Sequence, residues 1–495
     1  MPIMDEPTSL DPQIADSNSE KLVAANCYEG LVRIMADGTI GKGVATDWNI
    51  SDDGLTYTFK LRNNSHWAMF SGHKAVLGEN YEDTFDITVK AEDFKFGIER
   101  TLSEQTGSAD APLFSAVKSI STPDDFTIVF NLSYADDNFL YALTNPGAMP
   151  CDEEFFNLTN GKYGLDAKYL LCNGPFHVSK WTEKTSVKLA KNNEYNGESS
   201  VSPSSVTFYI NNDDSEVADK MNSVTYDVAF LSSSQFSSIE NKKDLNSVAV
   251  QNVTYSFIFN QNDNNYRNKN MRLAFCRSCD TSSLFDSQSD ISKADGIVPP
   301  SCKIGGEDYR NGNAAELLSY DETLAKKNFN DALLELGSSS VETTILCTEQ
   351  YEPFVKQMVQ KLQKTLGVKF VSTVKVVSES DLEAAVNDGN YSVAFYPFKA
   401  KSSFAGEIIE GFDKNNIFGY ESDVLSQKIR NIKNNSGSLE GERSAVADAE
   451  NYLVSEAVIM PVFYENSYFV TSKKTSGIYF YSSADNVCFI NAKKS

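Results

Sequence analysis

Residues 51–62 read SDDGLTYTFKLR, and this stretch decides how the first part of the chain folds. Its Asp-Asp-Gly at 52–54 is a turn signal, and apolar side chains then alternate with polar ones from Leu55 to Leu61. The residues just before the turn, 47–50 (DWNI), supply a partner strand. The sequence therefore predicts a β-hairpin with one half-buried face.

Beyond the hairpin, residues 91–102 (AEDFKFGIERTL) carry a helical pattern. Phe94, Ile98 and Leu102 recur every four residues, so they lie on one stripe of a helix. Two acidic residues in the first turn suit the positive end of the helix dipole. We predict a helix here that packs one apolar face.

The rest of the first half is rich in short apolar runs that predict strands. They lie at 126–132, 187–192, 206–210, 226–231 and 254–260. Polar stretches rich in Ser, Asn and Gly are predicted as surface loops. These are residues 193–205, 280–295 and 434–441.

After residue 260 the pattern changes to helices that alternate with strands, which is typical of α/β units. The clearest unit has a strand around ILCT (345–348), a helix from Glu352 and a strand at 369–377. Gly367 provides the stop signal of that helix. This order predicts a βαβ unit.

With 495 residues, the chain is longer than one hydrophobic core usually supports, so we expect two or more packed units. Its 44 Lys and Arg against 68 Asp and Glu give a formal net charge of −24, which repels nucleic acid and anionic membranes. No run approaches the roughly 20 apolar residues of a membrane span. We expect any export signal and lipid anchor to belong to the precursor.

The sequence lacks the usual signatures of catalysis and of a metal centre. There is no GxSxG, no GxxxxGK[ST], no GxGxxG after a strand and no HExxH, and the chain has only three histidines. Cys276 and Cys279 form one CxxC without the second pair that a zinc site needs, and the eight cysteines are too few for a disulfide scaffold. We therefore predict no catalytic residues, no metal and no cofactor.

Several short segments, taken in order, resemble one known family. They are SLDP (9–12), YEGLVR (28–33), SDDGLTYTFKLR (51–62), KAEDFKFGIERTL (90–102), CNGPFHVSKW (172–181), NNEY (192–195), FIFNQNDNNYRNKNMRLAF (257–275), ADGIVPPS (294–301) and MPVFY (460–464). Together they resemble the oligopeptide/dipeptide-binding family (family 5) of extracellular solute-binding proteins that serve ABC importers. The resemblance spans nearly the whole chain, and residues 67–89 depart from its pattern.

This resemblance implies an α/β, two-lobed periplasmic-binding-protein-like (type II) fold with three subdomains and a hinge of two crossing segments. The implied main subdomain of the N-terminal lobe comprises residues 1–47, 170–260 and 458–495. Residues 48–169 form an inserted subdomain, and residues 261–457 form the C-terminal lobe.

The function that the resemblance implies is that of an extracytoplasmic receptor, at the cell surface or in the periplasm, which captures an oligopeptide by lobe closure. Expected partners are the ligand and the membrane permease subunits of an ABC importer, with the receptor itself a monomer and no nucleic acid involved. The alternatives are an oligosaccharide or another small solute as ligand, and, from a different class, a secreted hydrolase.

The resemblance also suggests ligand-binding residues. Glu29 matches an acidic cleft position, and Tyr255, Phe257 and Tyr464 lie on the two crossing segments. For Glu29 a capping or surface role is an equal alternative. For the aromatic residues a core role is the more frequent alternative.

In VAFYPFKAK (393–401), Tyr396, Phe398 and Lys399 stand where peptide receptors often carry a Trp and an Asp that binds the ligand amine. Lys399 would repel an amine, and Asp413 or Glu29 could replace the missing carboxylate. The ligand class therefore stays open between a peptide with a free amine and another solute.

Overall fold

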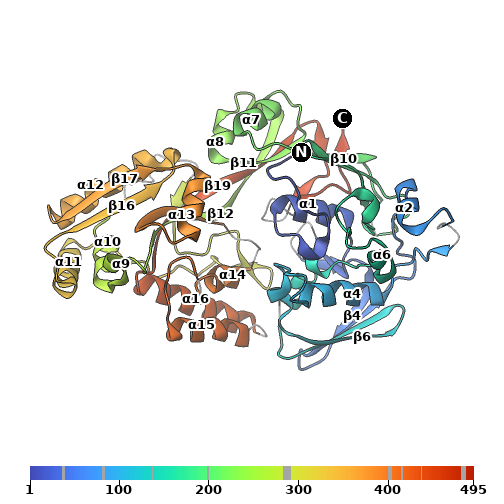
Figure 1. Cartoon of the computed structure of the whole chain (residues 1–495), viewed down its shortest axis with the longest axis horizontal. Coiled ribbons are helices and arrows are strands. Elements are labelled where there is room, and N and C mark those ends of the chain that lie inside the picture. Colours follow the sequence, from blue (N-terminus) through green and yellow to red (C-terminus); the bar gives the residue numbers. More distant parts are fainter. Residues whose placement is uncertain are drawn as a thin grey trace. The chain divides into compact units, whose positions relative to one another are not determined.

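The computed structural model describes residues 1–35, 39–80, 84–136, 138–197, 200–281, 291–399, 404–413, 416–435, 438–480 and 487–495. The chain divides into two compact units (Figure 1). Unit 1 comprises residues 1–250 and 468–495, and unit 2 comprises residues 251–467. Among the described helices, none has both the length and the hydropathy that a bilayer crossing needs.

Unit 1 contains two four-stranded sheets, in the orders β1-β10-β9-β8 and β4-β5-β7-β6. The strands of the first sheet are β1 (Pro2–Ile3), β8 (Phe176–Thr182), β9 (Ser186–Lys191) and β10 (Ser205–Ile210). Those of the second sheet are β4 (Ala45–Ile50), β5 (Thr56–Leu61), β6 (Val117–Asp124) and β7 (Thr127–Leu132). The main helices are α1 (Asn18–Cys27), α4 (Ala91–Leu102), α6 (Glu153–Leu158), α7 (Asp214–Asn222) and α8 (Ser233–Ser238).

The predicted hairpin is confirmed, because β4 and β5 pair antiparallel. Its turn forms for local reasons: the Gly54 N–H donates to the Ser51 carbonyl at 2.8 Å, and the Asp53 carboxylate accepts from the Leu55 N–H at 3.0 Å. Gly54 has a φ of 69°, a conformation that costs glycine little. The helix predicted at 91–102 is confirmed as α4 with the same bounds.

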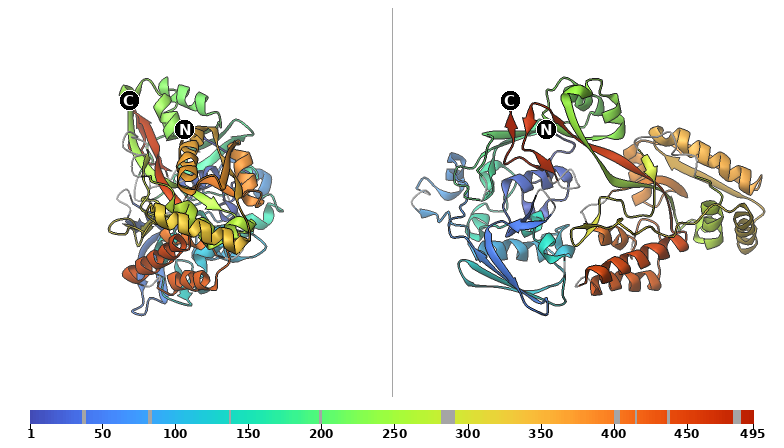
Figure 2. Two further views of the ribbon diagram at one scale, coloured as in Figure 1. Left: turned by 90° about the vertical axis from the view of Figure 1, so that its left-hand side faces the viewer. Right: turned by 180° about the vertical axis from the view of Figure 1, so that it is seen from behind.

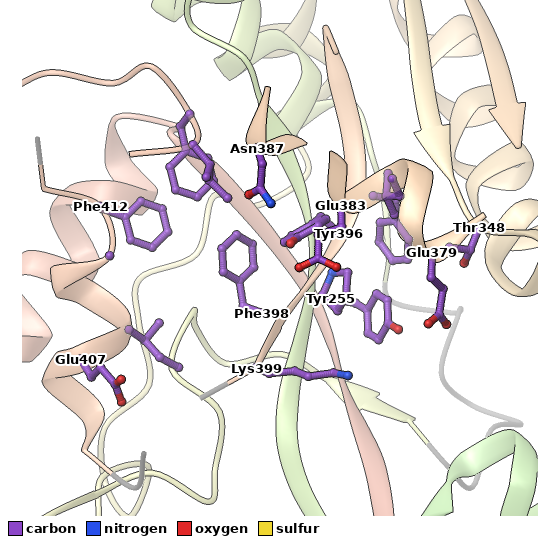
Figure 3. A pocket seen from close by; sticks show the side chains of 17 residues that line it. Tyr255, Thr348, Glu379, Glu383, Asn387, Tyr396, Phe398, Lys399, Glu407 and Phe412 are labelled. Carbon is purple, nitrogen blue, oxygen red and sulfur yellow. The ribbon is translucent and has the colours of Figure 1, made fainter. Parts of the chain in front are cut away.

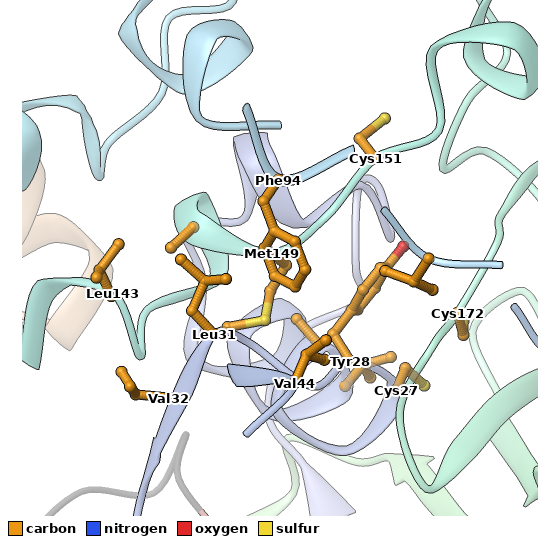
Figure 4. Packing of buried hydrophobic residues seen from close by; sticks show 14 of the residues in the cluster. Cys27, Tyr28, Leu31, Val32, Val44, Phe94, Leu143, Met149, Cys151 and Cys172 are labelled. Carbon is orange, nitrogen blue, oxygen red and sulfur yellow. The ribbon is translucent and has the colours of Figure 1, made fainter. Parts of the chain in front are cut away.

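The core of unit 1 packs side chains from α1, α4 and both sheets. Figure 4 shows Tyr28, Leu31 and Val44 beside Met149 in this core. Glycine is required at position 174, because a Cβ there would lie 2.6 Å from the Cys27 carbonyl carbon and the Tyr28 nitrogen. The NGPF segment thus has a packing role against the end of α1.

Most of the seven-stranded sheet lies in unit 2, and its outer strand β11 belongs to unit 1. The order of this sheet is β11-β19-β12-β18-β16-β17, with β13 paired to β19. Its strands are β11 (Val228–Ser232), β12 (Leu245–Phe259), β13 (Ile291–Lys293), β16 (Val341–Cys347), β17 (Phe370–Val376), β18 (Val393–Lys399) and β19 (Ile459–Ser472). The helices of unit 2 are α9 (Asn264–Arg267), α10 (Lys269–Arg277), α11 (Glu322–Leu336), α12 (Glu352–Leu366), α13 (Glu379–Asn387), α14 (Ala405–Glu410), α15 (Asp423–Asn434) and α16 (Leu439–Ser455).

The predicted βαβ unit is confirmed, since β16 and β17 are parallel and α12 connects them. Two loop predictions were partly wrong. Within 280–295, residues 291–293 form β13 and pair with β19. Residues 282–290 of that stretch lie outside the described residues. Within 434–441, residue 434 ends α15 and residues 439–441 begin α16.

Two long strands, β12 and β19, pass from one unit to the other, and they are neighbours in the sheet (Figure 2). The unit boundaries fall inside both strands, so unit 2 (251–467) extends ten residues beyond each end of the lobe predicted at 261–457. The division of the first lobe into two subdomains stays a prediction.

Residues 67–89, where the family pattern breaks, carry a buried histidine in the described part of the segment. The side chain of His73 is 1% exposed, its Nε2 lies 3.1 Å from the Leu170 carbonyl oxygen, and Phe70 packs against its ring. The pKa of His73 is lowered from 6.5 to about 4, mainly by burial and to a smaller extent by the neighbouring His177, while the hydrogen bond to Leu170 opposes the shift. The native state therefore holds His73 neutral.

This depressed pKa predicts a stability that depends on pH. Unfolded chains bind a proton at His73 below pH 6.5, whereas native chains do so only near pH 4, so stability falls as the pH drops through this window. Across this window the free energy of unfolding should fall by about 3 kcal/mol. Urea unfolding followed by tryptophan fluorescence reports on unit 1, because Trp48, Trp67 and Trp181 all lie in it.

The variant His73→Gln should flatten this pH dependence, and His66→Gln, at a half-buried histidine of the same region, should leave it unchanged. An equal slope in wild type and His73→Gln would contradict the assignment.

Candidate functional site

A cavity of about 660 Å³ opens in unit 2 at the carboxyl ends of three strands. Thr348 follows β16, Glu379 follows β17 and Lys399 ends β18, and all three line the cavity. The full lining is Tyr255, Thr348, Glu379, Leu382, Glu383, Asn387, Phe395, Tyr396, Pro397, Phe398, Lys399, Glu407, Ile408, Gly411, Phe412, Ile417 and Phe418 (Figure 3).

The topology of the sheet explains why a cavity forms here. From β16 the chain passes through α12 to β17, and from β17 it passes through α13 back to β18 on the other side of β16. The apolar side chains of α12 and α13 join different hydrophobic clusters, so the two helices cover opposite faces. Crevices at the carboxyl ends of parallel strands form where successive connections diverge in this way, and ligands bind there.

Strand β18 presents one free backbone edge to this cavity. On one side it pairs with β12 along its whole length, from Val393 to Lys399. On the other side it pairs with β16 only at Val393 and Ala394, and no other strand in the described part of the chain continues that pairing. The last five residues of β18 therefore have an edge without a partner strand.

The register shows which backbone groups point toward that edge. The Asn260 N–H donates to the Ser392 carbonyl at 3.1 Å, so even-numbered residues of β18 direct their polar backbone groups to β12. Phe395, Pro397 and Lys399 direct theirs to the free edge. Proline has no N–H, so this edge is rich in carbonyl acceptors and poor in donors.

Aromatic rings form both walls of the cavity. On one face of the sheet, Tyr255 packs against Phe395 at 5.4 Å between ring centroids and against Tyr351 at 4.4 Å. On the other face, Phe398 stacks with Phe412 at 6.0 Å and with Phe418 at 5.8 Å. Because the lining comes from both faces of β18, the cavity wraps around the strand edge.

The charged residues that line the cavity are mostly acidic: Glu379, Glu383 and Glu407 against the single cation Lys399. Figure 3 shows Glu379 and Glu407 on opposite sides of the cavity. Glu379 and Glu383 are one helical turn apart on α13, so they lie on the same face of that helix. The site thus favours a positively charged group on its ligand.

The two tyrosines of the lining stay protonated. Burial, and then the charge of Glu465, raises the pKa of Tyr255, and burial, and then the charge of Glu383, raises the pKa of Tyr396. Both hydroxyls therefore remain hydrogen-bond donors at neutral pH.

Four of the residues suggested from the sequence meet at this cavity: Tyr255, Tyr396, Phe398 and Lys399. Phe257 does not line it. It lies on the same face of β12 as Tyr255 but two residues further into the sheet, is fully buried and packs on Phe275 and Phe395. The structure gives Phe257 a core role.

Tyr464 also lies away from the cavity lining. It is 2% exposed, its hydroxyl accepts a hydrogen bond from the Asp295 N–H at 3.1 Å, and the carbonyls of Gly296 and Val298 lie 3.3 Å away. Its hydroxyl therefore holds the 294–301 segment against β19.

Glu29 lies in unit 1 and is buried rather than free. Its carboxylate forms an ion pair with Arg62 and accepts a hydrogen bond from the Tyr195 hydroxyl at 3.1 Å. The Asn173 side chain binds the backbone of Glu29 at both its N–H and its carbonyl. These contacts link the YEGL, NGPF and NNEY segments.

Sequence reasoning missed Glu379 and Glu383 as lining residues. Both are exposed and lie on a polar helix, where carboxylates usually only face solvent. Asp413, the alternative carboxylate suggested by the sequence, does not line the cavity, and it accepts a hydrogen bond from Ser426 at 2.7 Å. One sequence feature could have identified the two glutamates: they lie on the helix that follows the last strand of the βαβ unit, next to the carboxyl end of the sheet.

Comparison with known proteins gives a family match over most of the chain. The family model described as bacterial extracellular solute-binding proteins, family 5, matches residues 39–418. A curated relative, the dipeptide-binding protein DppE of Bacillus subtilis, is 24% identical over 96% of this chain and 88% of its own length.

Solved structures share the fold. OppA of Listeria monocytogenes bound to peptide has a TM-score of 0.77 at 20% identity, covering 100% of this chain and 98% of its own. AgaA of A. tumefacien R10, in complex with agropinic acid, has a TM-score of 0.73 at 17% identity, covering 99% of this chain and 97% of its own.

The contacts of Tyr464 predict a structural effect of its removal. Tyr464→Phe should lower the free energy of unfolding by about 1–3 kcal/mol, because the Asp295 N–H loses its buried acceptor. Tyr320→Phe, at an exposed tyrosine of the same unit, is the matched control. Circular dichroism during urea unfolding measures the difference, and a loss of ligand affinity without a loss of stability would contradict the core role.

Proposed function

Because this chain belongs to the bacterial extracellular solute-binding proteins of family 5, we propose that it is the receptor of an ABC importer that captures an oligopeptide through its free amine. Family membership makes it a solute-binding protein rather than an enzyme, so the hydrolase alternative is dropped. The permease subunits of the importer are its proposed membrane partners.

The observation that carries this proposal is the free edge of β18 inside the cavity. An extended peptide can add to such an edge as a further strand, and its main-chain groups then replace the missing partner. Carbonyls at Phe395, Pro397 and Lys399 require a ligand that donates more hydrogen bonds than it accepts at this edge. A peptide with an N-terminal ammonium group meets that requirement.

Glu379 and Glu383 would supply the negative charge that the ammonium group needs. They are carried by α13 and not by the 393–401 segment, where the family resemblance predicts an Asp. Lys399 would then lie along the ligand and away from the amine, with its charge nearer to a carbonyl or carboxylate of the peptide. The aromatic rings on both faces of β18 give apolar contacts to peptide side chains without selecting one sequence.

A second candidate ligand, an oligosaccharide or another small polar solute, draws support from the same aromatic and carboxylate lining and from the neighbour that binds agropinic acid. Such ligands do not need an ammonium group. The dependence on a free amine therefore distinguishes the two candidates.

The amine dependence is measured by calorimetric titration with alanine-lysine peptides of two to five residues, each in free and N-acetylated form. Free peptides should bind, and acetylation should cost about 1.5–3 kcal/mol, roughly 10- to 150-fold in affinity. The double variant Glu379→Gln/Glu383→Gln should lose a similar amount of binding free energy for the free peptides, and its affinity for the acetylated peptides should not change.

Glu342→Gln, at an exposed glutamate on β16 outside the cavity lining, is the control and should bind as wild type does. Equal binding of free and acetylated peptides would contradict capture through the amine. Closure of the two units on the ligand, which the family resemblance implies, stays a prediction.

A further inference from the structure

A second cavity of unit 2, about 350 Å³ in volume, brings together three sulfur-containing side chains. Cys276 and Cys279 reach it from the end of α10, and Met460 reaches it from β19. Apolar residues of β19 and α16 line the interior, and exposed residues such as Lys293, Ser319 and Tyr320 line the rim. The sulfur atoms therefore lie in an apolar chamber with a polar entrance.

The two thiols are positioned by helical geometry. Cys276 lies in the last turn of α10, and Ser278 after it keeps helical backbone angles, so residues 276 and 279 are one turn apart. Side chains at this spacing lie on the same side of a helix. Both cysteines are buried, at 2% and 4% exposure, and both are free thiols.

The sulfur donors of this chamber are soft, and Asp280 adds a single carboxylate to its lining. Among the described residues, no group of three or more His, Cys, Asp or Glu side chains could hold a metal ion. Zinc in structural sites takes four such ligands, so the chamber does not suit zinc. Thiolate and thioether sulfur select monovalent copper, which is satisfied by two or three ligands.

We propose that Cys276 and Cys279 bind one Cu⁺ ion, or its chemical analogue Ag⁺, as thiolates, with the Met460 thioether as a third ligand. Binding forms three metal–sulfur bonds, two to thiolates and one to the thioether, in place of the bonds from the metal to its donor chelator; it releases both thiol protons to solvent and transfers no electron. The site lies outside the peptide cavity and shares no lining residue with it.

Basic residues from neighbouring elements support the negative charge of two thiolates. Lys361 of α12 and Arg272 and Arg277 of α10 favour the ionised thiols, whereas burial, the larger effect, raises the pKa of Cys276 to about 12 and that of Cys279 further. The metal-free thiols are therefore protonated at neutral pH. Affinity for the metal should rise with pH, because binding displaces two protons.

The test is an anaerobic titration of the reduced full chain with Cu⁺ supplied as its bathocuproine disulfonate complex, whose colour is lost when the protein withdraws the metal. The wild-type protein should take one equivalent of Cu⁺ from the coloured complex and bind it tightly, and added Zn²⁺ should not displace it. Cys276→Ser/Cys279→Ser should lose this equivalent, and Met460→Leu, which keeps the apolar volume, should weaken it several-fold.

The double variant Cys27→Ser/Cys172→Ser is the matched control, because these two buried cysteines of unit 1 also neighbour each other (Figure 4). It should keep the Cu⁺ equivalent that the 276/279 variant loses. X-ray absorption should show only two or three sulfur neighbours around the metal. Retention of the equivalent by the 276/279 variant, displacement by Zn²⁺, or no uptake by wild type would each overturn the proposal.

Discussion

The structure of the site depends on one constraint: β18 is displaced along its neighbour β16, so most of β18 extends past the end of that strand. Strand β12 satisfies one side of β18 completely, whereas β16 stops pairing after Ala394. Backbone polar groups that are shielded from water need hydrogen-bond partners, so an edge of this kind must be either hydrated or covered. Because α12 and α13 diverge to opposite faces of the sheet, they do not cover the edge of β18, and this edge is accessible to a ligand.

Several buried polar side chains stabilise the scaffold without lining the cavity beside β18. Glu450 of α16 accepts hydrogen bonds from the N–H groups of Ile297 and Val298 and from the Tyr309 hydroxyl, and it pairs with Arg310. Arg272 donates to four backbone carbonyls, including that of Ala457 just before β19. Several of the family-like segments, such as 294–301 and 172–181, are thus explained by scaffold contacts.

Local patterns allowed the hairpin, α4 and the βαβ unit to be predicted, because turn chemistry and helical periodicity act within a few residues. The site was only partly predictable. The segment that holds Tyr396, Phe398 and Lys399 was found through family resemblance, whereas Glu379 and Glu383 lie on an exposed helix and become relevant only through the strand order. Phe257 could not be separated from Tyr255 by sequence, because alternation puts both on one face and does not show where a cavity ends.

The central claim is that the cavity at the free edge of β18 captures a peptide by its amine. Native mass spectrometry of the protein, purified without denaturation, tests it most directly, because a captured ligand stays bound and its mass is measured. The account predicts a set of peptide masses whose N-termini are free, and loss of that set in the Glu379→Gln/Glu383→Gln variant. A sugar mass, or peptides with blocked N-termini, would contradict it.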